Sequence, residues 1–419
     1  MKHKLTISTL LLLALFSALA PAALASTTWY VNGGNGNDTN NCLSPTTACK
    51  TIGHAISLAL SGDTIMVAAA TYRENLTIVR SLTITGAGVT TTIIDGGGVN
   101  SVVTVSSANA HVSLSKLTIR NGSAKCGGGI LNIGTLAIIG STISGNRASS
   151  TAVNTGGGGG ICNTGRLTIY NSTISGNQAN GNIERFSSGG GIGNGGTLTI
   201  DRSTVSGNSV HFGQGGGINS GGGTVTINHS TINGNNGFLR GGGILIVGGT
   251  VRLNNSTISG NSASSGHGGG IENLYGTAAV NNSTVSGNSS WHSSGGIENV
   301  GGTFTFQNSI VANNSGANCF NNANWTSNGY NMSSDATCPF SNSGDRNGKD
   351  PLLDSLKSNG GPTQTQALLT GSPAIAAGNP SGCTDDKGKL LMTDQRGMPR
   401  PNSEDTKGCD MGAYEKQSD

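Results

Sequence analysis

Short runs of alternating apolar and polar residues recur along the middle of this chain, and they recur at a fixed period. Each repeat reads as a glycine-rich stretch ending in isoleucine, then a TLTI-like run, then NSTISGN or a close variant. The isoleucines that end the glycine-rich stretch lie 31, 31, 26, 26, 27 and 26 residues apart, at Ile130, Ile161, Ile192, Ile218, Ile244, Ile271 and Ile297. A fixed period of this size predicts a repeat architecture.

One repeat, residues 192–208, contains three strand-like segments. Ile192 and Asn194 alternate with glycine, Leu198 and Ile200 alternate with threonine, and Val205 lies between Thr204 and Ser206. Glycine and asparagine separate the segments, and both residue types tolerate the positive φ of tight corners. Because three such strands cannot bury an apolar face alone, we expect successive repeats to stack about 4.8 Å apart. The sequence therefore predicts an all-β fold, a single-stranded parallel β-helix with three parallel sheets.

Equivalent positions of successive repeats should form columns. Two apolar columns of the second strand are Leu136, Leu167, Leu198, Val225, Val251, Ala278 and Phe304, and Ile138, Ile169, Ile200, Ile227, Leu253, Val280 and Phe306. Two asparagine columns mark the corners, at Asn132, Asn163, Asn194, Asn273 and Asn299, and at Asn146, Asn177, Asn208, Asn235, Asn261, Asn288 and Asn314. Stacked asparagine amides can hydrogen-bond between coils, so we interpret them as structural residues and not as ligands.

The segments outside the regular repeats have other roles. Residues 1–25 resemble a secretory signal, with basic residues, an apolar run and small residues before Ser26; an uncleaved anchor helix is the alternative. Residues 26–64 are predicted to form an N-terminal cap, in which residues 48–60 form a capping helix with Ile52, Ala55, Ile56, Ala59 and Leu60 on one face. The β-helix is expected over residues 65–318 and an irregular C-terminal module over residues 319–419.

The composition of the chain disfavours some classes of partner and indicates disulfide bonds. Removing the signal leaves 21 of the 23 Lys and Arg residues against 20 Asp and Glu, a net charge of about +1, which disfavours nucleic acid as a partner. Eight cysteines in a secreted chain indicate disulfides, although sequence alone does not fix their connectivity. The candidate pairs are Cys42 with Cys49, Cys126 with Cys162, Cys319 with Cys338, and Cys383 with Cys409.

Motifs at both ends of the chain resemble known families. The N-terminal motifs are WYVNGGNGND at Trp29–Asp38, KTIGHAI at Lys50–Ile56 and GDTIMV at Gly62–Val67. These are similar to right-handed parallel β-helix proteins of the pectate-lyase-like superfamily, and the repeats resemble polymorphic outer membrane protein repeats. The C-terminal motifs are DPLL at Asp350–Leu353, NGGPTQT at Asn359–Thr365, GSPAIAAG at Gly371–Gly378, TDQRG at Thr393–Gly397, Arg400-Pro401 and CDMGAYE at Cys409–Glu415.

The C-terminal motifs resemble the choice-of-anchor Q domain, although Ala376 stands where family members usually carry Asp. The resemblance implies a right-handed β-helix that is secreted or displayed at the cell surface. It implies no particular reaction, since a fold hosts many functions.

Candidate chemistry is sparse in the regular repeats. Glu272 and Glu298 each follow the isoleucine of the glycine-rich motif in adjacent coils, so we expect them to point outward about 5 Å apart. His267 and His292 lie just before the same two motifs and approach this pair. Such a pair would have a perturbed pKa or attract a cation, Ca²⁺ included. The alternatives left open are catalysis, contact with a sugar or cation, and an ordinary solvated surface.

Two corners carry extra residues. The distance from the corner asparagine to the next isoleucine is 15 positions in the first two full repeats and nine or ten in the later ones. We expect the longer loops to project side by side, with Arg147, Glu184, Arg185 and Phe186 as the lip of a binding cleft. Drift in loop length is the alternative.

The sequence favours a secreted or cell-surface β-helix protein, non-catalytic, of a surface, adhesion or glycan-binding type. The alternative is a polysaccharide lyase or glycoside hydrolase acting on an extracellular acidic polysaccharide. Extracellular glycans or cell-surface components are the expected partners. We expect a monomer without a transmembrane span in the mature chain and without a dedicated cofactor.

Overall fold

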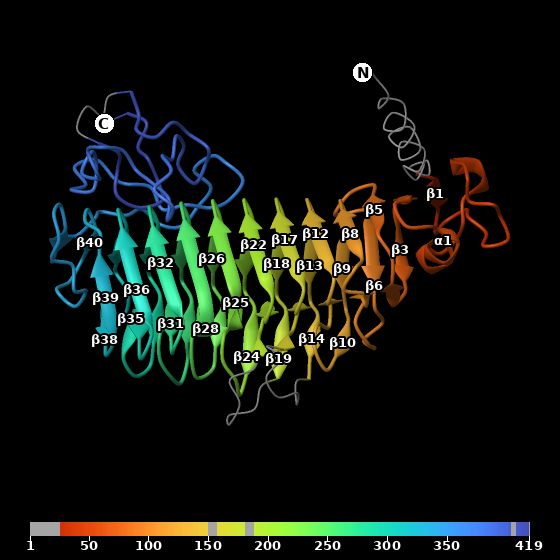
Figure 1. The fold of residues 1–419 in the computed structure, drawn as a ribbon, viewed down its shortest axis with the longest axis horizontal. Coiled ribbons are helices and arrows are strands. Elements are labelled where there is room, and N and C mark those ends of the chain that lie inside the picture. Colours follow the sequence, from red (N-terminus) through yellow and green to blue (C-terminus); the bar gives the residue numbers. More distant parts are fainter. Residues whose placement is uncertain (1–25, 150–156, 181–187, 404–407, 419) are drawn as a thin grey trace, which may run out of the picture.

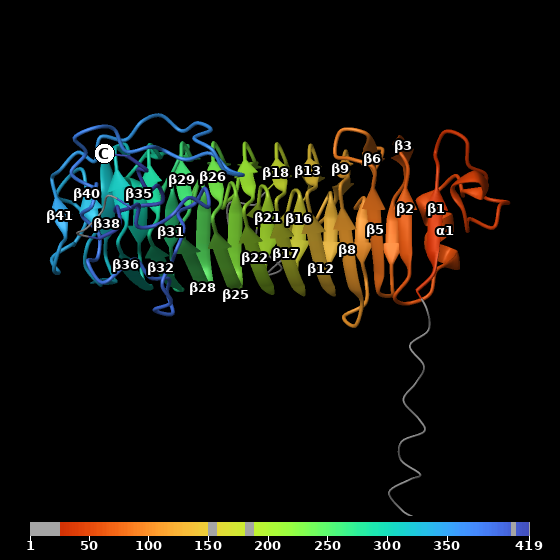
Figure 2. The ribbon, with the colours of Figure 1, turned by 90° about the horizontal axis from the view of Figure 1, so that it is seen from above.

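The chain forms an elongated right-handed parallel β-helix (Figures 1 and 2). The computed structural model describes residues 26–149, 157–180, 188–403 and 408–418. Three parallel sheets run along the rod, as predicted, and we call them sheets A, B and C. A separate pair of two-residue strands, β15 (Gly157–Gly158) and β20 (Ser188–Gly189), accompanies them.

Sheet A contains the first two strands of each coil. Its strands are β1 (Thr28–Val31), β2 (Thr64–Val67), β4 (Leu76–Ile78), β5 (Leu82–Gly86), β7 (Val103–Val105), β8 (His111–Ser115), β11 (Ile130–Asn132), β12 (Thr135–Ile139), β16 (Ile161–Asn163), β17 (Arg166–Tyr170), β21 (Ile192–Asn194), β22 (Thr197–Asp201), β25 (Ile218–Asn228), β28 (Ile244–Asn254), β31 (Ile271–Asn273), β32 (Thr277–Asn281), β35 (Ser294–Asn299), β36 (Thr303–Gln307), β38 (Ala317–Asn321) and β39 (Asn324–Ser327). In β25 and β28 the two strands of the coil are continuous, which places two of the predicted columns in one sheet.

Sheet B holds the TIS strands and sheet C holds short strands at the following corner. Sheet B consists of β3 (Ala70–Arg73), β6 (Thr92–Asp95), β9 (Thr118–Arg120), β13 (Thr142–Ser144), β18 (Thr173–Ser175), β23 (Thr204–Ser206), β26 (Thr231–Asn233), β29 (Thr257–Ser259), β33 (Thr284–Ser286), β37 (Ile310–Ala312), β40 (Met332–Ser333) and β41 (Arg346–Asn347). Sheet C consists of β10 (Ser123–Ala124), β14 (Arg147–Ala148), β19 (Gln178–Asn180), β24 (Ser209–His211), β27 (Asn236–Gly237), β30 (Ser262–Ala263) and β34 (Ser289–Ser290).

The register confirms the predicted core columns. Ile130 pairs with Ile161, and Leu136 pairs with Leu167, so equivalent side chains of successive coils lie over one another. These side chains are fully or almost fully buried. A thin core of stacked aliphatic side chains is thus the main apolar stabilisation of the rod.

The corner asparagines form two amide ladders inside the rod, of which the longer is continuous and the other is interrupted at Ser220 and Ile246. In the longer ladder, Asn177 Nδ2 donates to Asn208 Oδ1 at 3.0 Å, and Asn208 Nδ2 donates to Asn235 Oδ1 at 2.9 Å. In the other ladder, Asn132 Nδ2 donates to Asn163 Oδ1 at 2.7 Å. Because these amides are buried and bonded to one another, their role is structural, as the sequence indicated.

A short helix covers the N-terminal end of the core. Helix α1 (Ile52–Leu58) is shorter than the predicted 48–60, because it begins after an N-cap at Thr51 and its C-cap, Ala59, is already extended. Leu60 consequently lies outside the helix and is 60% exposed, which corrects its predicted place on the apolar face. The carboxylate of Glu74 accepts hydrogen bonds from the backbone amides of Ile52 and Gly53 at the first turn.

The coils continue beyond residue 318 through β38–β41, and the following segment then folds back over sheet B (Figure 1). This segment, residues 350–403 and 408–418 of the described chain, is called here the C-terminal module. It contacts the outward threonines of sheet B: Thr231 Oγ1 donates to the carbonyl of Gln364 at 2.6 Å, and Thr257 Oγ1 donates to Gln395 Oε1 at 2.6 Å.

Buried charges fix the C-terminal module to the coils. Arg400, 1% exposed, donates to Glu415 Oε2 at 2.8 Å, to the carbonyl of Gly412 at 2.8 Å and to Asn255 Oδ1 of the rod at 2.7 Å. The Arg400–Glu415 pair therefore links the module to a coil that is distant in sequence.

All four expected disulfides form, between Cys42 and Cys49, Cys126 and Cys162, Cys319 and Cys338, and Cys383 and Cys409. Among the residues that the structure describes, no helix has the length and apolar character needed to cross a membrane.

Candidate functional site

The corner that carries sheet C brings most of the predicted site residues to one edge of the rod. After β24, β27 and β30 the chain turns back over the glycine-rich strand that follows, where Gly215, Gly241 and Gly268 closely approach the residue after its isoleucine. Close packing of these loops requires glycine: a Cβ on Gly242 would lie 2.4 Å from the carbonyl oxygens of Gly269 and Ser262. We call this corner, with its loops, the sheet C edge.

Glu272 and Glu298 lie side by side beneath these loops. They pair directly between β31 and β35, as predicted from the repeat. They point away from the core, yet Glu272 is fully buried and Glu298 is 4% exposed, which differs from the solvated position expected from sequence. The reason is the loop before β31, since a Cβ on Gly268 would lie 2.6 Å from the Cβ of Glu272.

Neighbouring polar side chains complete the acid pair. Arg240 of the preceding coil forms an ion pair with Glu272 Oε1, and Ser293 donates a hydrogen bond to Glu298 Oε2. His267 Nδ1 lies 3.3 Å from Glu298 Oε1, so this histidine does approach the pair, as predicted. Arg240 is the partner that sequence reasoning missed.

Burial changes the acidity of this pair. The pKa of Glu272 is raised to about 8, mainly by burial; Arg240 opposes this rise and the adjacent Glu298 adds to it. Within the described parts of the chain, Glu272 Oε2 has no hydrogen-bond partner. Glu272 thus binds its proton more tightly than a solvated glutamate does. Since neither carboxyl is accessible, the pair cannot contact a polysaccharide directly in this conformation.

The surface above the acid pair is aromatic and basic. Phe212 and Phe238 meet edge to face at 5.3 Å between ring centroids, and His267 stacks on His292 at 5.5 Å. Trp291, beside His292, is 76% exposed. We call the set of His211, Phe212, Phe238, Arg240, His267, Trp291 and His292 the aromatic–histidine ridge. It follows the sheet C edge over four successive coils, from β24 to β34.

Sequence reasoning found two histidines of the ridge, His267 and His292, but not His211 or the aromatic residues. Gln214, Arg240 and His267 pair in neighbouring coils, so their 26- and 27-residue spacing was the available signal. Phe212, Phe238 and Trp291 gave a weaker signal, because the equivalent residue of the coil between Phe238 and Trp291 is Ser264.

Of the predicted loop lip, the structure describes Arg147 alone. Arg147 lies in β14 of sheet C, is exposed, and donates through Nη2 to Asn180 Oδ1 at 3.3 Å. Glu184, Arg185 and Phe186 lie outside the described residues. Their role as a lip stays a prediction, and Arg147 itself lies on the same edge as the ridge.

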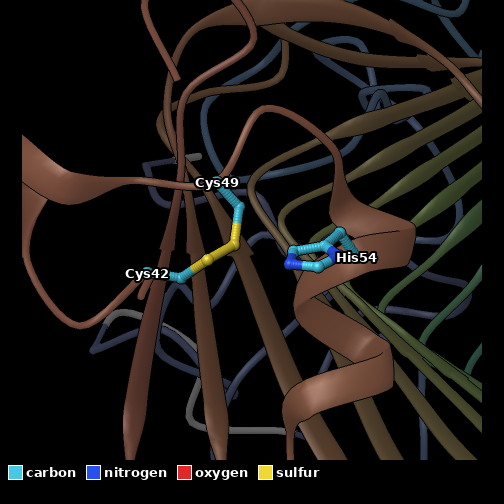
Figure 3. Close-up of side chains that lie close together, drawn as sticks. All are labelled: Cys42, Cys49 and His54. Atoms are coloured by element: carbon cyan, nitrogen blue, oxygen red, sulfur yellow. A yellow bond between two sulfur atoms is a disulfide. The ribbon is translucent and has the colours of Figure 1, made fainter. Parts of the chain in front are cut away.

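One group of close potential metal ligands occurs within the described ranges, and it lies in the N-terminal cap. Cys42, Cys49 and His54 gather there, but the two sulfur atoms are joined in a disulfide beside the His54 ring (Figure 3). Thiolates are the form in which cysteine binds metal, so this oxidised pair does not fit a metal centre.

Comparison with known proteins places the fold. No protein-family model and no curated protein matches this chain. Among solved structures, the pectate lyase Pel9A superposes with a TM-score of 0.50 and 18% identity, covering 93% of this chain and 96% of that chain. XylC, solved in complex with xylose, superposes with a TM-score of 0.55 and 11% identity, covering 93% and 98%. The chain therefore has the pectate-lyase-like right-handed parallel β-helix fold.

Proposed function

We propose that this chain is an extracellular β-helix protein that binds a polysaccharide along the sheet C edge. The observation that carries the proposal is the aromatic–histidine ridge, which places exposed Phe212 and Trp291 and two stacked histidines along a stretch of four coils, from β24 to β34. Aromatic side chains with an apolar face and polar neighbours suit sugar rings, which are apolar on one face and polar at their edges.

The geometry of the rod supports an extended ligand. Coils are spaced about 4.8 Å apart, close to the length of one pyranose ring, so a linear glycan can keep one register over several coils. The buried acid pair contributes indirectly, because Glu272 holds Arg240 and Glu298 holds His267 at the base of the ridge. Both glutamates therefore act as positioning residues.

Other features support the extracellular and surface parts of the proposal. Four disulfides are typical of an oxidising compartment. Arg400 and Glu415, which belong to the motifs that resemble the choice-of-anchor Q domain, are the residues that fix the C-terminal module to the rod. That shared role supports assigning the module to this domain type.

The test is affinity for purified polysaccharides, measured by affinity electrophoresis and calorimetry with polygalacturonate, alginate, xylan and a neutral glucan. The variant Trp291→Ala should weaken binding about tenfold, because the aromatic surface removed is the size of one sugar contact. Tyr275→Ala is the matched control, since Tyr275 is 71% exposed at a different corner of the rod. Equal losses in both variants, or no binding by the native protein, would refute the proposal.

The alternative function is cleavage of such a polysaccharide, and the fold shared with a pectate lyase and with the xylose-bound XylC favours it. The buried acid pair does not supply an accessible general acid, so cleavage would require carboxylates elsewhere. Incubating the protein with the same panel, with Ca²⁺ or with a chelator, decides this. New unsaturated ends indicate a lyase and new reducing ends alone indicate a hydrolase, whereas an unchanged polymer that still binds supports the binding function.

A further inference from the structure

A polar pocket of about 460 Å³ opens at the N-terminal end of the sheet C edge. Its floor is formed by the outward side chains of three consecutive coils, Thr77 of β4, Thr104 of β7 and Leu131 of β11, which pair in register. Asn100 and Lys125 stand at its wall. Lys125 is exposed and is the charged member of the described lining.

A disulfide bond forms the boundary of this pocket on its C-terminal side. Cys126 is part of its lining and is bonded to Cys162, the residue that follows Leu131 in the outward column. Beyond Cys162 the same column is buried over the next five coils, from Gly193 to Glu298, as at Leu245 and Glu272, which are both fully buried; only Phe320, at the far end of the column, is exposed again. The outward column is therefore open to a ligand on one side of the disulfide and closed on the other.

We propose that this pocket binds one uronic acid unit of an acidic polysaccharide. Lys125 would pair with the sugar carboxylate, and the hydroxyls of Thr77 and Thr104 with the amide of Asn100 would meet the ring hydroxyls. Leu131 offers an apolar surface to one face of the ring. A pocket with one cation, several neutral donors and acceptors and an apolar patch matches the chemistry of a hexuronate.

This inference rests on the proposed function and specifies its substrate class. Three observations support it independently of the ridge. They are the cavity, the single charged residue of its lining, and the disulfide that closes one side of the cavity. Since Lys125 follows β10 of sheet C, the pocket lies on the same edge of the rod as the ridge.

The experiment compares oligogalacturonate with its fully methyl-esterified form, which keeps the ring and loses the charge. Binding is measured by calorimetry in the presence of a chelator, on the native protein, on Lys125→Met and on Lys116→Met. Lys116 is the matched control, because it is exposed at another corner of the same coil. A third variant, Thr104→Trp, fills the pocket without changing its charge.

The native protein should bind the acid form about tenfold more tightly than the ester, the factor expected for one charge-assisted hydrogen bond. Lys125→Met should abolish this preference and leave ester affinity unchanged, Lys116→Met should change neither, and Thr104→Trp should weaken both ligands. If Lys125→Met retains the preference, the pocket assignment is wrong. If Lys125→Met behaves as native while Trp291→Ala loses binding, the pocket assignment is wrong and the proposed function stands; if the native protein binds no polysaccharide, both are wrong.

Discussion

Replacing Glu272 with glutamine should remove a large part of the pH dependence of this protein's stability. The sign follows from the raised pKa. An unfolded glutamate titrates near 4.5, whereas in the fold burial raises the pKa of Glu272 to about 8. Folding therefore favours the protonated form. The free energy of unfolding is unaffected by this group below pH 4.5, falls as the pH rises between the two values, and reaches its lower level above about pH 8.

The magnitude is set by the distance between the two pKa values. At about 1.4 kcal/mol for each unit, moving from 4.5 to about 8 corresponds to about 5 kcal/mol. That is comparable with the whole net stability of many domains, about 5–15 kcal/mol. Glutamine is similar in shape and does not titrate, so Glu272→Gln keeps the packing under the loop and removes the cost of burying the charge.

The assay is urea unfolding at pH 5 and at pH 9, followed by circular dichroism, for the native protein and Glu272→Gln. Asp410 also titrates in this window, because burial and the neighbouring Glu415 raise its pKa to about 7, so only the difference between the two proteins isolates Glu272. We expect the native protein to lose several kcal/mol more than the variant on going from pH 5 to pH 9.

Glu298→Gln provides a second check. Its removal takes away a negative neighbour that raises the pKa of Glu272, so the pH dependence should become smaller but not disappear. Equal pH dependence in the native protein and Glu272→Gln, or a native protein that gains stability from pH 5 to pH 9 by more than the variant does, would refute the reasoning.

Three further predictions test the interactions that stabilise the fold. Arg400→Ala leaves Glu415 buried without its cation and should cost about 3–5 kcal/mol, seen as proteolysis of the C-terminal module before the rod. Asn208→Ala interrupts the amide ladder and leaves buried donors and acceptors unpaired; urea unfolding should show a loss of about 2–4 kcal/mol. Replacing Cys126 and Cys162 with serine opens a loop with a sequence separation of 36, and chain entropy predicts a loss of about 4 kcal/mol in the same assay.

The β-helix could be predicted from the sequence because each core column is represented by several equivalent residues, one in each repeat. A single Ile143 is an ambiguous strand residue, but the same position recurs as Ile174, Val205 and Ile232, and parallel stacking is the arrangement that buries all of them. The asparagine ladders followed for the same reason. Their hydrogen bonds connect neighbouring coils, so a period in sequence becomes a contact in space.

The candidate site was less predictable, because alternation fixes which way a side chain points but not what lies over it. Glu272 was correctly placed beside Glu298 and away from the core, yet its burial depends on how the preceding loop turns back. Leu245 occupies the same position one coil earlier and is equally buried. A leucine at this outward position was therefore a sign in the sequence that a loop covers the column. The hydrogen bond between Thr257 and Gln395 joins residues 138 positions apart. Because Gln395 lies outside the repeats, the repeat pattern could not predict this contact.

Residue types at equivalent positions differ more between coils on some surfaces of the rod than on others, and these differences indicate where a ligand can be recognised. Inside, the core columns stay apolar from coil to coil, because a polar side chain there would be buried without a partner. On sheet B the threonines of β26, β29 and β33 are already bonded to the C-terminal module, which limits what they can bind. Along the sheet C edge, by contrast, the residues that directly follow consecutive strands are Phe212, Phe238, Ser264 and Trp291. Nothing in the stacking requires these differences, so we expect ligand recognition to reside there, and exchanging this edge should change ligand preference while preserving the fold.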